Sequence, residues 1–457
     1  MSTIRKRGNN YQIRVSCGYR VNGEQIIKTM TYKPLPGMTE KQIQKELKRE
    51  AVIFEEKCLN GTIMSGNIKL GDFMEKWFKD YGEKQLKAKT FSTYKVLSER
   101  VKQALGHIAV SKIRPHHLIE FYNNLAESGV REDIKYKATE KLIKIIKCKA
   151  LTVKQLSERT GVSENAIMNC KQGKNVSKGT ADKITAYFNE TGLFEPVNAL
   201  KPLSGKTILH YHRFISSVLS AAVEWQIISS NPCQRVKPPK VEKKEAVYLD
   251  EVEAARLINC LDNEPLPFKT MIMLFLFSGM RRGELCGLEW SDIDFKNNLI
   301  NISKSSLYLP EKGIFEDTTK NKTSERVIRV PQEMTELLKE YRKEQNKRRL
   351  MYGDMWKGSN KIFTGEDGRP IHPDTVSGQF NKFIKRYDLP PVHIHSLRHT
   401  NATLLIAAGT DIRTVAKRLG HATATTTANI YAHAIKTADE LAAEKLADIL
   451  HPINKAN

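Results

Sequence analysis

The feature that most constrains this chain is a linker of Pro and Lys residues near its middle. The segment "RVKPPKVEKKEAVYL", residues 235–249, combines a Pro pair with a Lys-rich run and has no apolar periodicity, which is typical of a connection between domains. A helix start follows at once, because Asp250 is a preferred N-cap and Glu253 completes a capping box. A separate domain is therefore expected over residues 247–457.

The charge of the chain indicates a polyanionic partner. The sequence has 457 residues and a formal net charge of +23, a surplus that favours nucleic acid as the partner. It contains neither a long apolar run nor an apolar segment behind its first residues, so we expect no membrane span and no secretory signal. The seven scattered Cys residues show no metal-ligand spacing and predict reduced thiols in a cytoplasmic protein.

The N-terminal residues 1–62 predict a β-hairpin followed by a helix. Alternating residues on either side of Asn22-Gly23 indicate two strands and a tight turn, and a charged helix follows that Gly61 should end. The basic strand residues could face a DNA groove, although a solvated sheet face explains them equally well. These residues are Arg5, Lys6, Arg7, Arg14 and Arg20.

Residues 66–240 predict a helical domain with an insert. Apolar residues at spacings of three and four indicate four helices, the last of which should end before Pro232. Within the insert, residues 135–200, a helix, Gly161 at a turn and a second helix resemble a helix-turn-helix of the Cro/repressor type.

The predicted helix-turn-helix has two interpretations. Its core should consist of Leu156, Val162 and Ile167. Either its second helix faces a major groove, or the insert packs as a helical unit that never touches bases, because Glu164 would repel phosphate and that helix carries few cations. The residues that could face the groove are Ser163, Glu164, Asn165 and Asn169.

Four short stretches of the last domain carry candidate catalytic residues. The stretch "SGMRRGELCG" holds Arg281, and "TTKNKTSERVIRVP" holds Lys320 at an expected hairpin. The stretch "HIHSLRHT" places His395 and Arg398 on one side of a helical turn. The fourth, "GHATATTTANIYAH", holds His421 and Tyr431. Each residue alone is more commonly a surface or packing residue, and the joint occurrence is what favours a site.

These residue types fit chemistry on a phosphodiester. Two guanidiniums can neutralise the non-bridging oxygens as charge builds in the transition state. A tyrosine hydroxyl is a poor nucleophile near neutral pH and needs a base, which a neutral His can supply. A Lys ammonium can protonate the leaving sugar oxygen. Because the phosphotyrosine link has about the energy of the bond broken, rejoining would need neither ATP nor metal.

The four stretches resemble the boxes of the tyrosine recombinases, the lambda-integrase-like site-specific recombinases, of the phage or conjugative-transposon type. The resemblance covers residues 65–450 without the insert. It implies that Lys320 is the catalytic lysine, with Lys322 as the competing choice, and that the site has six catalytic residues in total. These are Arg281, Lys320, His395, Arg398, His421 and Tyr431.

The resemblance implies a multidomain, mostly α fold with small β-sheets. We expect an arm-type DNA-binding domain at 1–62, a helical core-binding domain at 66–240 and an α+β catalytic domain at 247–457 that ends in a helix. The family likeness implies a cytoplasmic bacterial integrase of a mobile element that needs no cofactor and is nucleoid-associated when bound to DNA. Expected partners are double-stranded DNA at attachment and arm sites, further copies in a tetramer, an excisionase and a host DNA-bending protein.

Two other functions remain open at this point. A type IB topoisomerase would share the chemistry, and assembly into a tetramer on two sites separates a recombinase from it. A helix-turn-helix transcriptional regulator would leave the six-residue set unexplained, and a covalent DNA adduct of Tyr431 would exclude it.

Overall fold

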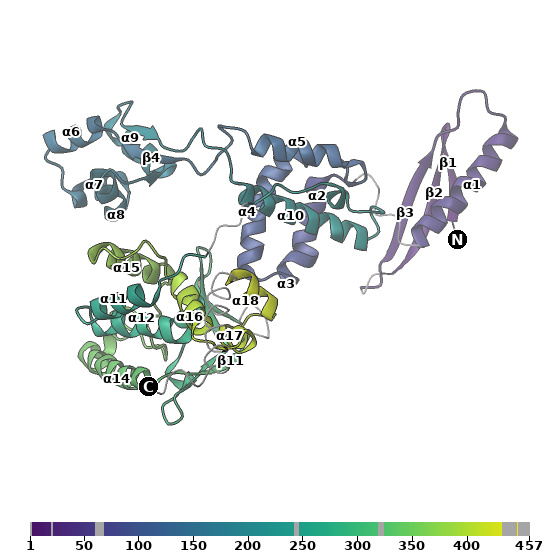
Figure 1. The fold of residues 1–457 in the computed structure, drawn as a ribbon. Helices are drawn as coiled ribbons and strands as arrows, with labels where there is room; N and C mark the ends of the chain where they lie inside the picture. Colours follow the sequence, from purple (N-terminus) through teal and green to yellow (C-terminus); the bar gives the residue numbers. More distant parts are fainter. Residues whose placement is uncertain are drawn as a thin grey trace. The chain divides into compact units, whose positions relative to one another are not determined.

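The computed structural model consists of two compact units, Met1–Glu242 and Lys243–Asn457, each of which is described here by itself. Both units are mostly helical with small β-sheets, as expected (Figure 1). The structure describes residues 2–19, 22–59, 68–241, 246–318, 324–431 and 446.

The N-terminal part is a three-stranded antiparallel sheet with one helix. The strands β1 (Ser2–Arg7), β2 (Asn10–Tyr19) and β3 (Gln25–Tyr32) lie in that order, and α1 (Glu40–Leu59) covers one face through the apolar side chains of β2. The hairpin and helix were predicted, but β1 was not. Its sequence has a single apolar side chain, Ile4, and so carries no alternation to detect.

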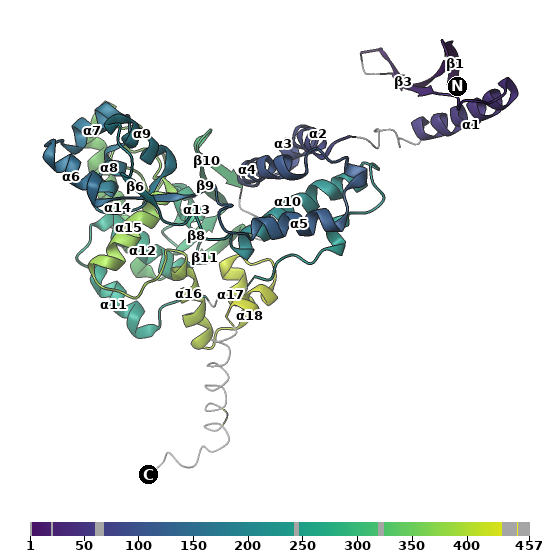
Figure 2. The same ribbon diagram turned by 90° about the horizontal axis from the view of Figure 1, so that it is seen from above.

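The helical domain has the four expected long segments (Figure 2). They are α2 (Leu70–Trp77), which continues through a π-helical turn and α3 (Glu83–Gln85), α4 (Ala88–Leu105), α5 (Pro115–Leu125) and α10 (Gly205–Glu224). Trp77 and Phe214 are fully buried between α2 and α10. The last helix ends well before Pro232, because Gln226 takes a positive φ of 57° that a helix cannot contain.

The insert folds around its own core and contains the predicted helix-turn-helix. Gly161 has a left-handed φ of 62° between the two helices, and the Ser163 hydroxyl accepts a hydrogen bond from the first turn of the second. Leu156, Val162 and Ile167 are buried as expected. The elements are β4 (Lys135–Ala138), α6 (Glu140–Cys148), α7 (Val153–Thr160), α8 (Glu164–Lys171), β5 (Val176–Ser177), α9 (Lys178–Phe188) and β6 (Phe194–Pro196).

The chain enters and leaves the insert side by side. Strands β4 and β6 are antiparallel partners, with Tyr136 opposite Pro196 and Ala138 opposite Phe194. Just beyond them the Val197 amide donates to the Lys135 carbonyl at 2.8 Å. The insert is therefore attached through a pair of hydrogen-bonded strands.

The second unit opens on the predicted capping box, in which Asp250 and Glu253 exchange hydrogen bonds of 3.0 and 2.7 Å. Its centre is the apolar helix α12 (Leu266–Ser278), which contacts both α14 and α16. The other helices are α11 (Glu251–Leu261), α13 (Arg282–Gly287), α14 (Gln332–Tyr352), α15 (Pro373–Arg386), α16 (Ser396–Ala407), α17 (Ile412–Leu419) and α18 (Ala424–Ile430).

Two small sheets complete the second unit. Strands β9 (Lys304–Leu309) and β10 (Gly313–Thr318) form a hairpin, whereas β11 (Arg326–Arg329) pairs with β8 (Leu299–Ile302), which also pairs with β7 (Ile293–Asp294). Lys320 was expected at a hairpin and itself lies outside the described residues. The strands that flank it belong to different sheets, because β11 is drawn to β8 by the buried Ile328 and Ile300.

Several predicted features lie outside the described residues. Lys320 and Lys322 fall in the undescribed segment 319–323, and the expected C-terminal helix, residues 432–450, is undescribed apart from Leu446. Among the helices that the structure describes, none is long and apolar enough to cross a membrane.

Candidate active site

Five of the six predicted catalytic residues lie in or next to the ends of four helices of the second unit, α13, α16, α17 and α18. Arg281 and His395 are the N-cap residues of α13 and α16, and Arg398 lies in the first turn of α16. His421 follows the last residues of α17, and Tyr431 is the C-cap of α18. Arg281 donates to the Gly420 carbonyl next to His421, Arg398 donates to the Gly279 carbonyl two residues before Arg281, and Tyr431 contacts His399 next to Arg398, so the structure brings these residues together.

Arg281 is held in place by a buried carboxylate. Its Nη1 atom lies 2.7 Å from Glu284 Oε1, and its Nη2 donates to the Gly420 carbonyl at 3.3 Å. The Arg281 amide also donates to Glu284, which closes the first turn of α13. The guanidinium is thereby fixed while its side chain stays 31% exposed and within reach of a ligand.

Glu284 connects Arg281 to a second, buried arginine. Arg326 Nη2 lies 2.9 Å from Glu284 Oε2, and both side chains are almost fully buried. Burial by itself would raise the pKa of Glu284, but the ion pairs with Arg326 and Arg281 outweigh it and hold that pKa below its usual range. The carboxylate therefore stays charged and orients both guanidiniums.

Arg398 carries the clearest sign of a missing anionic partner. Its side chain is 2% exposed, and its Nη1 donates to the Gly279 carbonyl at 2.8 Å. Its Nη2 is also buried and has no hydrogen-bond partner among the residues that the structure describes. Burial and then the charge of Arg281 lower the pKa of Arg398 to about 9. An unpaired buried donor is costly, and an anion would satisfy it.

The turn at Gly279 explains how α12 can approach α16 so closely. Gly279 ends α12 with a left-handed φ of 61°. A Cβ atom there would lie 2.7 Å from both the Asn401 Oδ1 and a Leu419 methyl group. Only glycine fits this position. The Gly279 carbonyl accepts the hydrogen bond from Arg398, and the chain reaches Arg281 two residues later.

Tyr431 is buried, and its hydroxyl contacts a histidine that was not predicted. The side chain is 0% exposed, and burial raises the pKa of the hydroxyl to about 12. The hydroxyl lies 2.9 Å from Nδ1 of His399. Burial, His395 and Arg398 lower the pKa of His399 to about 4, so its ring is neutral near pH 7.

The two predicted histidines have other surroundings. His421 Nδ1 lies 2.8 Å from the Thr427 hydroxyl in α18. Burial and the charges of Arg398 and Arg281 lower its pKa to about 4. His395 is more exposed, and partial desolvation followed by the charge of Arg398 lowers its pKa. Both rings are neutral near pH 7, as a hydrogen-bonding or proton-accepting role requires.

Sequence reasoning missed Glu284, Arg326 and His399. The "GMRRGEL" box contains Glu284 and the "HSLRH" box contains His399. His399 follows His395 by four residues, a spacing that places both on one face of a helix, and the signal was therefore present. Arg326 carried no such signal, because its partner is 42 residues away in the sequence.

The strand that leads to Lys320 is anchored by another buried cation, Lys361. Lys361 Nζ is hydrogen-bonded to the Gly287 carbonyl at 2.8 Å and forms ion pairs with Glu289 at 3.1 Å and Glu316 at 2.6 Å. Glu316 lies in β10, which ends two residues before Lys320. The described part of this strand is thus tied to the end of α13.

The face of the N-terminal sheet opposite α1 carries three of the predicted DNA-facing residues. Thr3, Arg5 and Arg7 alternate on β1, and the register places Thr3 opposite Arg14. Lys6 is opposite the buried Tyr11 and lies over its ring, so it belongs to the face of the sheet that α1 covers. Arg20 lies outside the described residues.

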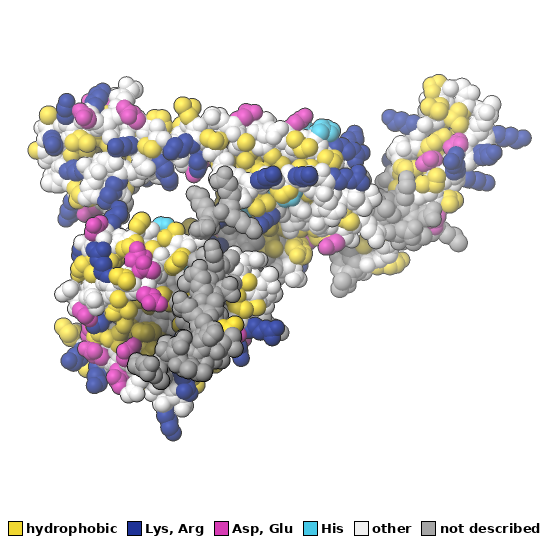
Figure 3. Space-filling model, viewed as in Figure 1, with side chains coloured by type: hydrophobic (Ala, Val, Ile, Leu, Met, Phe, Trp, Pro, Cys, Tyr) yellow, Lys and Arg dark blue, Asp and Glu magenta, His cyan; other side chains and the backbone are white. Residues whose placement is uncertain are grey.

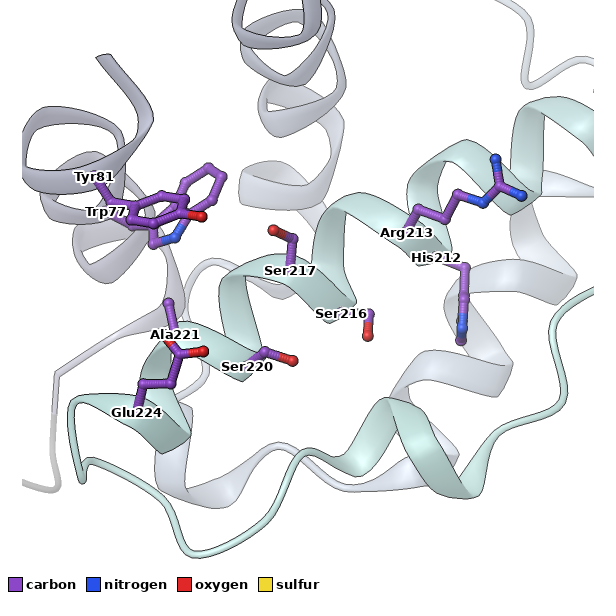
Figure 4. Close-up of a pocket in the computed structure, with 9 residues that line it drawn as sticks. All are labelled: Trp77, Tyr81, His212, Arg213, Ser216, Ser217, Ser220, Ala221 and Glu224. Atoms are coloured by element: carbon purple, nitrogen blue, oxygen red, sulfur yellow. The ribbon is translucent and has the colours of Figure 1, made fainter. Parts of the chain in front are cut away.

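A polar groove runs along α10 in the helical domain (Figure 4). Tyr81 and Trp77 lie on one side, and Arg213 points outward from α10. The floor is formed by serine side chains of α10, two of which accept hydrogen bonds from Asn231. The serines are Ser216, Ser217 and Ser220. Hydroxyls and a guanidinium are groups that bind phosphate oxygens.

The helix-turn-helix exposes few cations on its second helix. On α8, Glu164, Asn165 and Met168 are exposed, and Lys171 is its one basic residue and donates to the Leu151 carbonyl. Exposed Lys and Arg side chains are spread over the visible face of the insert (Figure 3). Among the described residues, no group of three or more His, Cys, Asp or Glu is placed to hold a metal ion.

Three family models match the chain. The phage integrase family matches residues 247–437, and the N-terminal SAM-like domain of phage integrases matches residues 69–126. The Cro/C1-type HTH DNA-binding domain matches residues 141–191. The models therefore cover most of the second unit, the first helices of the helical domain and most of the insert.

Similar proteins include recombinases and integrases. A tyrosine recombinase XerC-like protein of Caldanaerobacter subterraneus subsp. tengcongensis is 31% identical over 264 residues, which is 54% of this chain and 67% of the relative. The ICEBs1 integrase of Bacillus subtilis is 31% identical over 248 residues, with the same coverage of both chains. The Tn1549 transposon integrase, solved in complex with transposon right end DNA, is similar in fold, with a TM-score of 0.55 at 19% identity over 83% of this chain and 99% of that chain.

Proposed function

Because the chain belongs to the phage integrase family of tyrosine recombinases and is a site-specific DNA recombinase, we propose that Tyr431 is its nucleophile. The hydroxyl attacks the phosphorus of a DNA phosphodiester and forms a 3′-phosphotyrosine link, and the 5′-oxygen leaves. The reverse attack by a 5′-hydroxyl rejoins the strand. By this route the protein integrates and excises a mobile genetic element without metal or ATP.

The unpaired Nη2 of Arg398 is the observation that carries this proposal. It is a buried cationic donor without a partner among the described residues, and it belongs to the same group as Tyr431 and the partly exposed Arg281. A phosphate placed there would be held by two guanidiniums next to the tyrosine. His395 and His421 are neutral hydrogen-bonding groups beside that phosphate.

We assign the general acid to Lys320 by sequence. The residue lies outside the described part of the chain, two residues beyond β10. An ammonium group can protonate the leaving 5′-oxygen, and the anchoring of β10 by Lys361 supports a fixed approach to the site. Lys322 is the competing residue.

The other parts of the chain are proposed to select and assemble DNA. Residues 1–62 would bind arm sites through the Arg-bearing sheet face, residues 66–240 would clamp the core site, and residues 247–457 would perform the chemistry. Strand exchange requires a tetramer on two sites, to which the tail after Tyr431 would contribute. We further propose an excisionase and a host DNA-bending protein as partners, and association with the bacterial nucleoid.

Substitution of the nucleophile tests the proposed function. Tyr431→Phe removes the hydroxyl and keeps the ring, so DNA binding should persist while all strand cleavage is lost. The measurement is the covalent protein–DNA adduct on a nicked suicide substrate. Tyr352→Phe, at the end of α14, is the matched control and should form the adduct like the wild type. An adduct from the Tyr431→Phe variant would refute the proposal.

A further inference from the structure

The Tyr431 hydroxyl has one described hydrogen-bonding partner, and it is a residue outside the six predicted positions. His399 projects from α16 toward the end of α18, and its Nδ1 atom lies 2.9 Å from the hydroxyl oxygen. The two ring centroids are 5.7 Å apart. A proton acceptor has to lie within hydrogen-bond reach of the proton that it takes, and His399 meets this condition before DNA arrives.

The two predicted histidines are engaged differently. His421 Nδ1 is hydrogen-bonded to the Thr427 hydroxyl, which lies one helical turn before Tyr431. His395 stands edge-on to the His399 ring at 5.1 Å and is the more exposed of the two. These positions suit contacts to the phosphate better than contacts to the nucleophile.

We propose that His399 is the proton acceptor for the Tyr431 hydroxyl during DNA cleavage, an inference that rests on the proposed function. In the resting site the neutral ring receives the hydrogen bond at Nδ1. During attack the Oη–H bond breaks and its proton passes to His399 Nδ1, while the oxygen bonds to phosphorus. The P–O5′ bond breaks, and the leaving oxygen takes its proton from the general acid. Rejoining returns the proton from His399 to the tyrosine oxygen.

The surrounding charges make this acceptor dependent on DNA. Without DNA, burial and the charges of His395 and Arg398 hold the pKa of His399 at about 4, so the ring is a weak base. A phosphodiester between Arg281 and Arg398 adds a negative charge, which favours the protonated form of a nearby imidazole. His399 therefore gains basicity when the substrate is in place, and the buried Tyr431 stays protonated until then.

The substitution His399→Asn separates proton transfer from positioning. The Asn Oδ1 atom can accept the hydrogen bond near the place of Nδ1 but cannot take up the proton. We expect binding of attachment-site DNA to persist and single-turnover cleavage to fall on the order of 10²-fold, the lower range for loss of a general base. The control is His372→Asn, which keeps the N-cap of α15 because Asn is itself a good cap, and should cleave like the wild type.

A substrate that needs no tyrosine tests whether the loss is specific. DNA with a 3′-(p-nitrophenyl) phosphate end already has a good leaving group, so a Tyr431→Phe background can join it to a 5′-hydroxyl strand. Adding His399→Asn should leave this joining rate unchanged, whereas adding Arg281→Ala should abolish it. A joint loss of cleavage and joining in the His399→Asn variant would show general damage to the site and would overturn the proposal.

The outcomes also distinguish this inference from the proposed function. If Tyr431→Phe loses the covalent adduct while His399→Asn cleaves at the wild-type rate, the nucleophile stands and the role of His399 is wrong. If Tyr431→Phe still forms the adduct, the proposed function fails and the present inference fails with it.

Discussion

The active-site region and the insert both carry many cations, but they hold them in opposite ways. Around Tyr431 the guanidiniums of Arg398 and Arg326 are buried, and each has protein acceptors that fix it. In the insert, ion pairs such as Lys141–Glu190 are half-exposed and leave the side chains in water. The buried cations are held in one orientation, as the proposed chemistry on one phosphate requires, whereas the exposed cations of the insert are not held in this way.

The largest expected difference between the two regions is in the loss of folding stability when one carboxylate is removed from each. Glu284→Gln leaves Arg326 buried without its counter-charge and should cost about 3–5 kcal/mol. Glu190→Gln in the insert should cost only about 0–1 kcal/mol, because its ion pair is exposed. Chemical denaturation of the full chain measures both, and equal losses would remove the distinction between the two regions.

The variant Glu284→Gln also sharpens the contrast through the pH dependence of stability. The native pKa of Glu284 is lower than the unfolded value of ~4.3. Its contribution to stability is therefore full above that unfolded value and is lost as the pH falls through the lower native pKa. The stability difference between wild type and Glu284→Gln should shrink on acidification, which denaturation curves at several pH values would show.

Loss of either arginine should cut cleavage strongly. Arg281→Ala and Arg398→Ala should each lower the single-turnover rate by ~10²–10³, the range for one preorganised donor of transition-state stabilisation. Arg398→Lys should not restore the rate, because Lys cannot make the two-pronged contact. Near-native cleavage by the Lys variant would mean that Arg398 does not hold the phosphate.

Lys320→Ala should lower the cleavage rate by about 10² and be rescued by a change in the substrate. A 5′-sulfur leaving group needs little protonation, so this variant should recover on such DNA while Arg281→Ala should not. Single-turnover cleavage of oxygen and sulfur substrates makes the test. Rescue of Lys322→Ala instead would transfer the role to Lys322.

Deletion of the insert should have the smallest effect on binding and chemistry. Since α8 exposes Glu164 and offers its one Lys to a carbonyl group, few phosphate contacts are expected there, and each contact adds to the salt dependence of binding. The salt slope should fall by less than several units, the isolated insert should bind DNA weakly or not at all, and site choice should change more than cleavage. A loss of several units would identify the insert as a major DNA-binding module.

The sequence predicted the helices better than the contacts between them. Caps and apolar spacing located α11, the helical domain and the helix-turn-helix, because these signals are local. The strand β1 was missed because its residues are almost all polar. The pairing of β11 with β8 was not predictable, because it depends on residues more than 20 positions apart in the sequence.

The site was predictable as a set of residue types but not as a set of contacts. Box spacing pointed to Arg281, Arg398 and Tyr431, whose convergence the structure shows. The partner of the tyrosine was not predictable, because the choice between His395, His399 and His421 depends on how α18 packs against α16.

The paired strands at the base of the insert make this part of the chain exchangeable. Because β4 and β6 are paired, the points at which the chain leaves and re-enters the helical domain are adjacent. This holds for any domain that is placed between these two strands. A recombinase built in this way can acquire, lose or replace an inserted specificity domain while the helical domain keeps its fold. Grafting a different small domain between residues 138 and 194 is thus a route to directing the enzyme to new DNA target sites without changing its catalytic domain.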